Sequence, residues 1–169
     1  MTKRTLYLDM DDVVADWRGE AIRLLALEFD ANQWSLSNDE RSRLCESGRF
    51  YRNLPLLPGA HELVAWAKEY AHTNRLDLAF LTAVPYKIPM PFVYFDKVHW
   101  ANENFPGIPV FFGPTSKEKQ KHCKRGDILI DDKPSNCMEW RLAGGIAHQY
   151  TTWENCKHWI ENELRFTLF

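Results

Sequence analysis

The chain has 169 residues, which suits one domain of ordinary size with a small insertion but not a second independent core. It carries 21 Lys and Arg against 23 Asp and Glu, so there is no basic surplus to hold a phosphate backbone, and we expect no stable nucleic-acid partner. With 45% hydrophobic and 26% charged residues, the composition is that of a globular protein and excludes a disordered chain.

The cysteines and the N-terminus indicate the compartment. The four cysteines are widely spaced, with no Cys-x-x-Cys pair and no Cys/His cluster at zinc spacing, which favours a reduced protein inside the cell. The N-terminal segment turns acidic at Asp9, too soon for a signal peptide, and no later apolar run approaches the length of a membrane span. We therefore expect a cytoplasmic protein with no membrane contact. A homodimer is compatible with the sequence.

Apolar periodicity predicts strands and helices in alternation. In chain order we expect a strand at Thr5–Asp9, helices at Val13–Glu28 and Ser37–Cys45, a stiff connector at Leu54–Gly59, a helix at Ala60–His72, a strand at Leu76–Thr82, a helix at Phe92–Phe105, strands at Ile108–Phe112 and Asp127–Ile130, and helices at Pro134–Leu142 and Trp153–Leu164. Such alternation predicts an α/β fold with a parallel sheet, helices on both faces, and ligands bound beyond the carboxyl ends of the strands.

Carboxylates gather at two of these strand ends. Asp9 and Asp11 leave the first strand, and Asp131 and Asp132 end the last buried strand. So many acids in one place repel one another and need a cation, and hard oxygen ligands completed by a substrate phosphate suit Mg²⁺. Phosphoryl transfer is the reaction class that this pattern favours.

Two further groups are candidates for binding phosphate oxygens. Thr82, at the end of the strand predicted at Leu76–Thr82, offers a hydroxyl and a backbone N–H. A lysine run offers a positive charge from Lys121 or from its neighbours Lys117, Lys119 and Lys124. The residues alone leave open which lysine is used, because such a run is usually a solvated helix face.

Four ordered motifs together resemble the haloacid dehalogenase (HAD) superfamily of aspartate-nucleophile phosphatases. They are Leu8–Val13 (LDMDDV), Phe80–Thr82 (FLT), Lys121 and Ile128–Asp132 (ILIDD). Residues 9–17, 57–60, 96–100 and 126–132 narrow the resemblance to the 5′(3′)-deoxyribonucleotidases. These stretches are distributed over most of the chain, apart from about residues 27–48 and the C-terminal helix.

The resemblance implies a HAD-like core of residues 1–16 and 57–169, with residues 17–56 as a small helical cap inserted after the first motif. It implies Mg²⁺-dependent removal of phosphate from (deoxy)ribonucleoside monophosphates. Asp9 is expected to attack phosphorus and Asp11 to act as acid and base. Asp9, the Asp11 backbone carbonyl and Asp132 are expected to hold the metal, with Asp131 behind them.

The remaining assignments also come from the resemblance, apart from Lys87, which is a candidate by its position in the sequence alone. Lys121 is favoured over its neighbours because its distance before Asp131 matches that of the family's lysine. Lys87, which follows Thr82 closely, is a secondary candidate for the phosphate. Trp17 stands where the family carries a ring beside the base, although a core position on an amphipathic helix explains it equally well. Asp12 departs from the family, which has Gly there, and this puts the geometry of the turn in question.

Other functions remain compatible with the same residues. A HAD phosphatase with a different cap could act on another small phosphomonoester or on a polynucleotide 3′-phosphate. A receiver-like regulatory domain also combines acids, a Thr and a Lys on a parallel sheet, but its phosphoacceptor lies on a mid-chain strand and it has no acid two residues away. A catalytically silent binding module is the third alternative.

Overall fold

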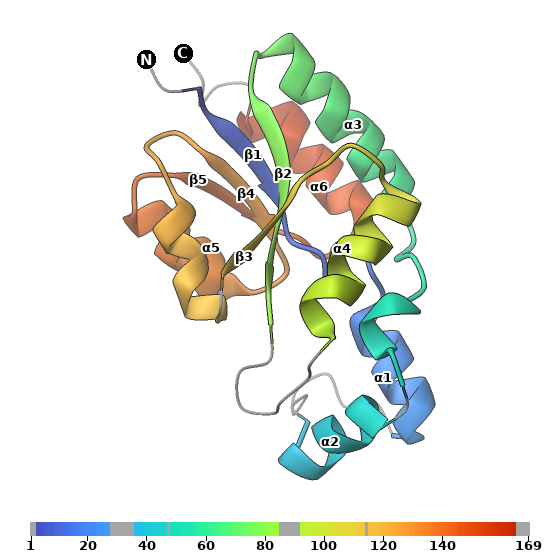
Figure 1. Ribbon diagram of the computed structural model, residues 1–169. Helices are drawn as coiled ribbons and strands as arrows, with labels where there is room; N and C mark the ends of the chain where they lie inside the picture. The colour runs from blue at the N-terminus through green and yellow to red at the C-terminus, as the bar shows by residue number, and fades with distance from the viewer. Residues whose placement is uncertain (1–2, 28–35, 47, 85–91, 114, 165–169) are drawn as a thin grey trace.

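The computed structural model describes residues 3–27, 36–46, 48–84, 92–113 and 115–164. Its centre is a five-stranded parallel sheet in the order β3-β2-β1-β4-β5 (Figure 1). The strands are β1 (Thr5–Leu8), β2 (Asp77–Ala83), β3 (Val110–Gly113), β4 (Ile128–Asp131) and β5 (Ile146–Gln149). The prediction of an α/β fold built on a parallel sheet is therefore confirmed, while β5 is a strand that the sequence analysis missed.

Helices cover both faces of the sheet, because successive residues of a strand point to opposite sides. Leu6 and Leu8 of β1 belong to the larger core, and Tyr7 between them belongs to the smaller one. The larger core is formed with α3 (Ala60–Thr73), α4 (Val93–Asn104) and α6 (Trp153–Trp159), which continues as a π-helical turn at Ile160–Leu164. The smaller core is formed with α5 (Pro134–Leu142).

Between β1 and α3 the chain forms a separate group of short helices. These are α1 (Trp17–Leu25), α2 (Asn38–Glu46) and the 3₁₀ helix η1 (Phe50–Arg52). In Figure 1, α1 and α2 lie beyond the lower end of the sheet. The chain leaves and returns side by side, since Asp16 N donates to Pro55 O and Leu57 N donates to Val14 O, both at 2.9 Å. This pairing supports our proposal that residues 17–56 form a cap on the core.

Local signals account for several helix ends. Ser37 and Glu40 form a reciprocal capping box before α2: Ser37 N donates to Glu40 Oε2 at 2.7 Å, and Glu40 N donates to Ser37 Oγ at 3.3 Å. Pro134 occupies the first turn of α5, where a missing N–H costs nothing.

No helix in the described ranges is both long enough and apolar enough to cross a membrane.

Candidate active site

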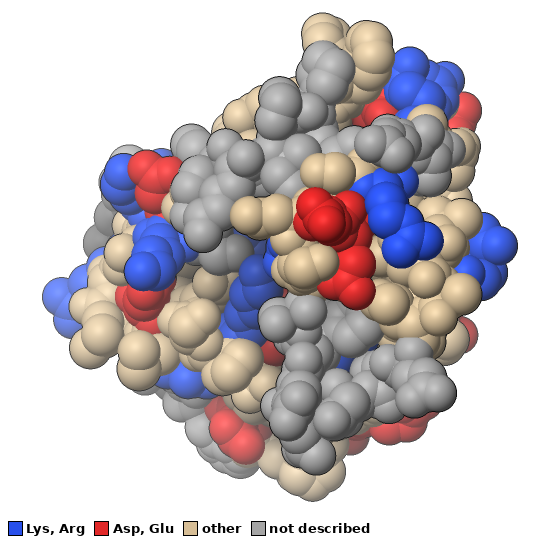
Figure 2. Space-filling view, turned by 90° about the horizontal axis from the view of Figure 1, so that it is seen from below, with Lys and Arg blue, Asp and Glu red and all other residues tan. Residues whose placement is uncertain are grey.

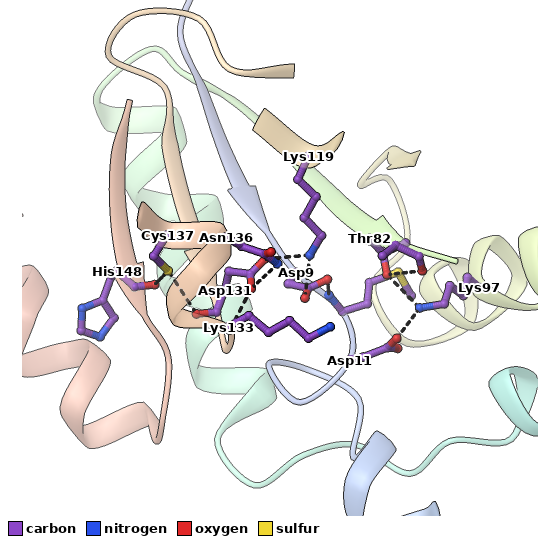
Figure 3. A network of polar contacts seen from close by, with 12 residues as sticks. Asp9, Asp11, Thr82, Lys97, Lys119, Asp131, Lys133, Asn136, Cys137 and His148 are labelled. Atoms are coloured by element: carbon purple, nitrogen blue, oxygen red, sulfur yellow. Dashed lines mark hydrogen bonds and ion pairs between the residues drawn. The ribbon is translucent and has the colours of Figure 1, made fainter. Parts of the chain in front are cut away.

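The carboxyl ends of β1, β2 and β4 bring three buried polar side chains together (Figure 3). The strands are in register, since Leu8 pairs with Phe80 on one side and with Ile130 on the other. Asp9, Thr82 and Asp131 therefore lie at one edge of the sheet, and each is at most 5% exposed. Residues more than 120 positions apart in the chain meet here because parallel neighbouring strands end at the same edge.

Lys119 supplies the positive charge of this site. It lies on the 3₁₀ helix η2 (Ser116–His122) and is 1% exposed. Its Nζ is 2.7 Å from Asp9 Oδ2 and 2.7 Å from Asp131 Oδ2. One buried ammonium group thus joins the acids of the first and fourth motifs.

The structure does not bring Lys121, the lysine that the resemblance favoured, to this edge of the sheet. Its side chain is 68% exposed, and its Nζ donates to Glu118 Oε1 at 2.6 Å on the surface. A 3₁₀ helix turns about 120° per residue, so positions 119 and 121 point in different directions. The charge pattern of this lysine-rich segment could not distinguish Lys119 from Lys121, because its lysines point to different sides of the helix.

The acids at this edge have unusual proton affinities. Burial raises the pKa of Asp9 to about 6, with the Lys119 charge opposing the rise and Asp131 and Asp11 adding to it. Burial and the charges of Asp9 and Asp131 raise the pKa of Asp132 to about 8. Burial alone would lower the pKa of Lys119, but the two carboxylates outweigh it and hold the ammonium group charged. The cluster therefore has more negative charge than Lys119 can offset.

The donor set fits a hard divalent cation. Oxygen atoms of Asp9, Asp131 and Asp132 all lie within 4.8 Å of one another. Asp131 is already engaged by the protein, since its carboxylate accepts hydrogen bonds from Lys119 Nζ, Asn136 Nδ2 and Lys133 N. Asp9 and Asp132 are consequently the carboxylates better suited to direct coordination.

Asp11 lies beside this cluster and is held by a second buried lysine. Lys97, from α4, donates from Nζ to Asp11 Oδ2 at 2.6 Å and to Thr82 Oγ1 at 2.8 Å (Figure 3). The sequence analysis did not single out Lys97 as a site residue. It lies in the stretch 96–100 that contributed to the resemblance, but only the packing of α4 against the end of β2 brings its amine to the site.

Asp12 makes the turn for which the resemblance implied a glycine. Its φ of 57° lies in the left-handed region, which Asp tolerates better than most side chains. Its Oδ1 accepts a hydrogen bond from Arg18 N at 2.8 Å, while Asp16 caps Gly19 N at 2.9 Å, so two acids satisfy the first turn of α1. Burial raises the pKa of Asp12 to about 6. Figure 2 shows the molecule from below the view of Figure 1, with acidic and basic side chains next to one another on that lower face.

Aromatic side chains of the cap lie next to Lys97. Trp17 Nε1 donates to Tyr51 Oη at 3.3 Å, and its ring meets Phe50 edge-on at 6.0 Å between centroids. The Tyr51 ring in turn lies under Lys97 Nζ, 4.8 Å from the ring centroid. Trp17 is partly exposed and is thus in packing contact without being fully enclosed. Lys87 lies outside the described residues.

A parallel α/β sheet with clustered carboxylates and a lysine at its carboxyl edge has the architecture of HAD-like hydrolases. A hydrolase from Streptococcus pneumoniae TIGR4 has the same fold, with a TM-score of 0.57, 11% identity, and coverage of 95% of this chain and 100% of that one. The HAD hydrolase YfnB from Bacillus subtilis, described as bound to magnesium, matches with a TM-score of 0.51 and 17% identity over 87% of this chain and 86% of that one.

The sequence comparisons identify the family. Residues 3–165 match the family model described as "5' nucleotidase, deoxy (Pyrimidine), cytosolic type C protein", and the chain belongs to this family. A Staphylococcus epidermidis protein named as a 5′(3′)-deoxyribonucleotidase is 29% identical over 184 aligned positions, 98% of this chain and 90% of that protein. The human mitochondrial 5′(3′)-deoxyribonucleotidase is 30% identical over 146 positions, 75% of this chain and 61% of that protein.

Family membership decides between the classes of function that the residues alone left open. The chain is a phosphoric monoester hydrolase of the 5′-nucleotidase type, and the predicted resemblance is confirmed. A receiver-like regulatory domain is not supported, because the match to a nucleotidase family covers nearly the whole chain.

Proposed function

We propose that the protein hydrolyses (deoxy)ribonucleoside monophosphates with Mg²⁺, through an aspartyl-phosphate formed on Asp9. The observation that carries this proposal is the setting of Asp9. It is a buried carboxylate at the end of the central strand, 2.7 Å from Lys119 Nζ and within reach of two further acids, in a chain of the nucleotidase family. An anionic nucleophile needs such compensation to approach an anionic phosphate.

The two steps divide between Asp9 and Asp11. In the first, an Asp9 oxygen bonds to phosphorus, the bond from phosphorus to the ribose oxygen breaks, and Asp11 gives its proton to that oxygen. In the second, Asp11 takes a proton from water as the water oxygen bonds to phosphorus. The bond to Asp9 then breaks and inorganic phosphate leaves. Asp11 ends each cycle protonated, as it began.

Mg²⁺ fits the oxygen donors of the site, and we assign its coordination to Asp9, Asp132 and the backbone carbonyl of Asp11. When bound, it neutralises charge between nucleophile and phosphate and polarises the phosphoryl group. Asp131 has a different role, because its hydrogen bonds from Lys119, Lys133 and Asn136 make it the residue that orients Lys119.

Lys119 and Thr82 are assigned to the phosphate group. Lys119 brings a positive charge to the nucleophile, so the negative charge that develops on the phosphoryl oxygens is stabilised in a buried site. Thr82 Oγ1 lies at the end of β2, held by Lys97 Nζ at 2.8 Å. The cap, with Trp17 at its start, would lie over the nucleoside.

Phosphate release from dUMP, dTMP and other nucleoside monophosphates in the presence of MgCl₂ tests the proposal. We expect turnover in the wild type and in Asp77→Asn, a surface control, and at least about a 10⁴-fold lower kcat in Asp9→Asn. Turnover of a generic phosphomonoester without turnover of any nucleotide would contradict the substrate class. Retained activity in Asp9→Asn would show that the nucleophile is wrongly assigned.

A further inference from the structure

A lysine with no role in the steps above is buried beside the active site. Lys97 lies on α4 and is 1% exposed, and its neighbour Asp96 is 3% exposed. Two adjacent charged side chains buried on one helix are costly unless each has partners. Asp96 accepts hydrogen bonds from Arg49 Nε at 2.8 and 3.0 Å, which ties the start of α4 to the cap.

The Lys97 ammonium group is fixed from three sides. Its Nζ donates to Asp11 Oδ2 at 2.6 Å and to Thr82 Oγ1 at 2.8 Å, and it lies 4.8 Å from the centroid of the Tyr51 ring. An ammonium group has three N–H donors, so two hydrogen bonds and one aromatic face define its position. Its contacts come from the first motif, the end of β2 and the cap.

The consequence for Asp11 is a carboxyl group with two unlike oxygens. Oδ2 is held by Lys97, whereas Oδ1 is buried and has no hydrogen-bond partner among the described residues. The Asp11 side chain as a whole is 27% exposed, so the site is open on one side. A carboxyl group anchored through one oxygen keeps a constant orientation.

We propose that Lys97 is the positioning residue of Asp11, holding Oδ2 so that the carboxyl group keeps the orientation in which it exchanges a proton with the leaving group and with water. This inference rests on the proposed function, because it needs Asp11 to be the acid and base. Lys97 does not touch the reacting atoms in it. Displacement of a reacting group by about 1 Å costs on the order of 100-fold in rate, so losing this anchor is expected to slow proton transfer severely.

Leaving groups that differ in their need for a proton test this role. Lys97→Met keeps the length of the side chain and removes its charge, and Lys157→Met is a matched control at a lysine that is 57% exposed. The measurement is kcat/KM for phenyl phosphate, whose leaving group needs the acid, and for p-nitrophenyl phosphate, whose leaving group hardly does. The parameter kcat/KM is suited to this purpose because it covers the steps up to departure of the leaving group.

We expect Lys97→Met to lower kcat/KM about 100-fold on phenyl phosphate and less than about 10-fold on p-nitrophenyl phosphate. Lys97→Met also removes the contact with Thr82. That loss weakens binding of phenyl phosphate and of p-nitrophenyl phosphate equally, so it leaves the ratio of their kcat/KM values unchanged. Equal losses on the two substrates would overturn the proposal. If Lys97→Met does not fold, Lys97→Gln, whose shorter and uncharged side chain gives the buried position a polar group without an ammonium group to hold Asp11, takes the same test with the same two outcomes.

A double-mutant cycle supplies an independent readout. If Lys97 acts through Asp11, adding Lys97→Met to Asp11→Asn lowers kcat/KM on phenyl phosphate by no more than about 3-fold further, and a full additional loss would overturn the proposal. Wild-type turnover of aryl phosphates without turnover of nucleotides would refute the proposed substrate class, yet would leave this test readable.

Discussion

Replacing Lys119 by Met is the substitution that tests the electrostatics of the site most directly. Lys119 is 1% exposed, and its Nζ is 2.7 Å from an oxygen of Asp9 and 2.7 Å from one of Asp131. Met has similar length and volume, so the main change is the loss of one buried charge. Two buried carboxylates then lose their shared cation, with Asp132 nearby.

The expected cost is large. Removing one partner of a buried ion pair typically destabilises a protein by about 3 to 5 kcal/mol, because the remaining charge is left without compensation. That is a major part of the 5 to 15 kcal/mol by which domains are usually stable. Lys121→Met on the same 3₁₀ helix is the matched control, and it should leave the free energy of unfolding unchanged because that side chain is 68% exposed.

Urea unfolding followed by circular dichroism, with a chelator present, measures both variants. The loss in Lys119→Met should also shrink as the pH falls, since protonation neutralises the carboxylates that lost their partner. A loss below about 1 kcal/mol, or one equal to that of Lys121→Met, would refute the view that Lys119 compensates the buried acids.

Three further predictions concern the metal, the turn and the cap. Burial raises the pKa of Asp9 to about 6 and that of Asp132 to about 8, so the folded state binds these protons more tightly than the unfolded chain; metal-free stability should therefore fall as the pH rises toward 8, and Mg²⁺ should oppose the fall. A melting temperature in chelator that stays flat or rises with pH would contradict this. Asp12→Asn should leave the free energy of unfolding unchanged, and Asp12→Gly should lose only the hydrogen bond that caps α1. Asp12→Ala should lower the free energy of unfolding most, by about 2 kcal/mol, because Ala lacks the cap and is strained at a φ of 57°. Equal melting temperatures for the Gly and Ala variants would contradict this explanation. Trp17→Ala should raise KM for nucleotides while sparing hydrolysis of a small aryl phosphate, and equal losses on both would assign the ring to packing.

Several elements follow from interactions within a few residues and are therefore readable in the sequence. Ser37 and Glu40 stand three apart and form the capping box before α2. Pro134 begins α5, and the apolar run before Asp131 becomes a fully buried strand. The strand β5 was missed because only Ala147 of its four residues is buried, and its pairing with β4 is what makes it a strand.

The residues of the site likewise divide into those that the sequence predicts and those that only the fold selects. Asp9, Asp11, Asp131 and Asp132 are recognisable because each pair stands at the end of a buried strand, and the order of the motifs indicates the family. The charge pattern left four candidate lysines and the resemblance favoured Lys121, since 3₁₀ and α-helical turns point the same residues in different directions and the sequence does not show which turn forms. Only the packing of η2 against the sheet selects Lys119, whose amine lies between Asp9 and Asp131.

By itself, the sequence determined the class of fold, the family and the acids that meet at the sheet edge, because these depend on local patterns and on motif order. The tertiary structure decided which cations meet those acids. Lys97 and Lys119 come from segments 86 and 110 residues after the acids they contact, Asp11 and Asp9. Their burial is tolerated only because the folded sheet edge supplies the opposite charges, and that compensation has no counterpart in local sequence.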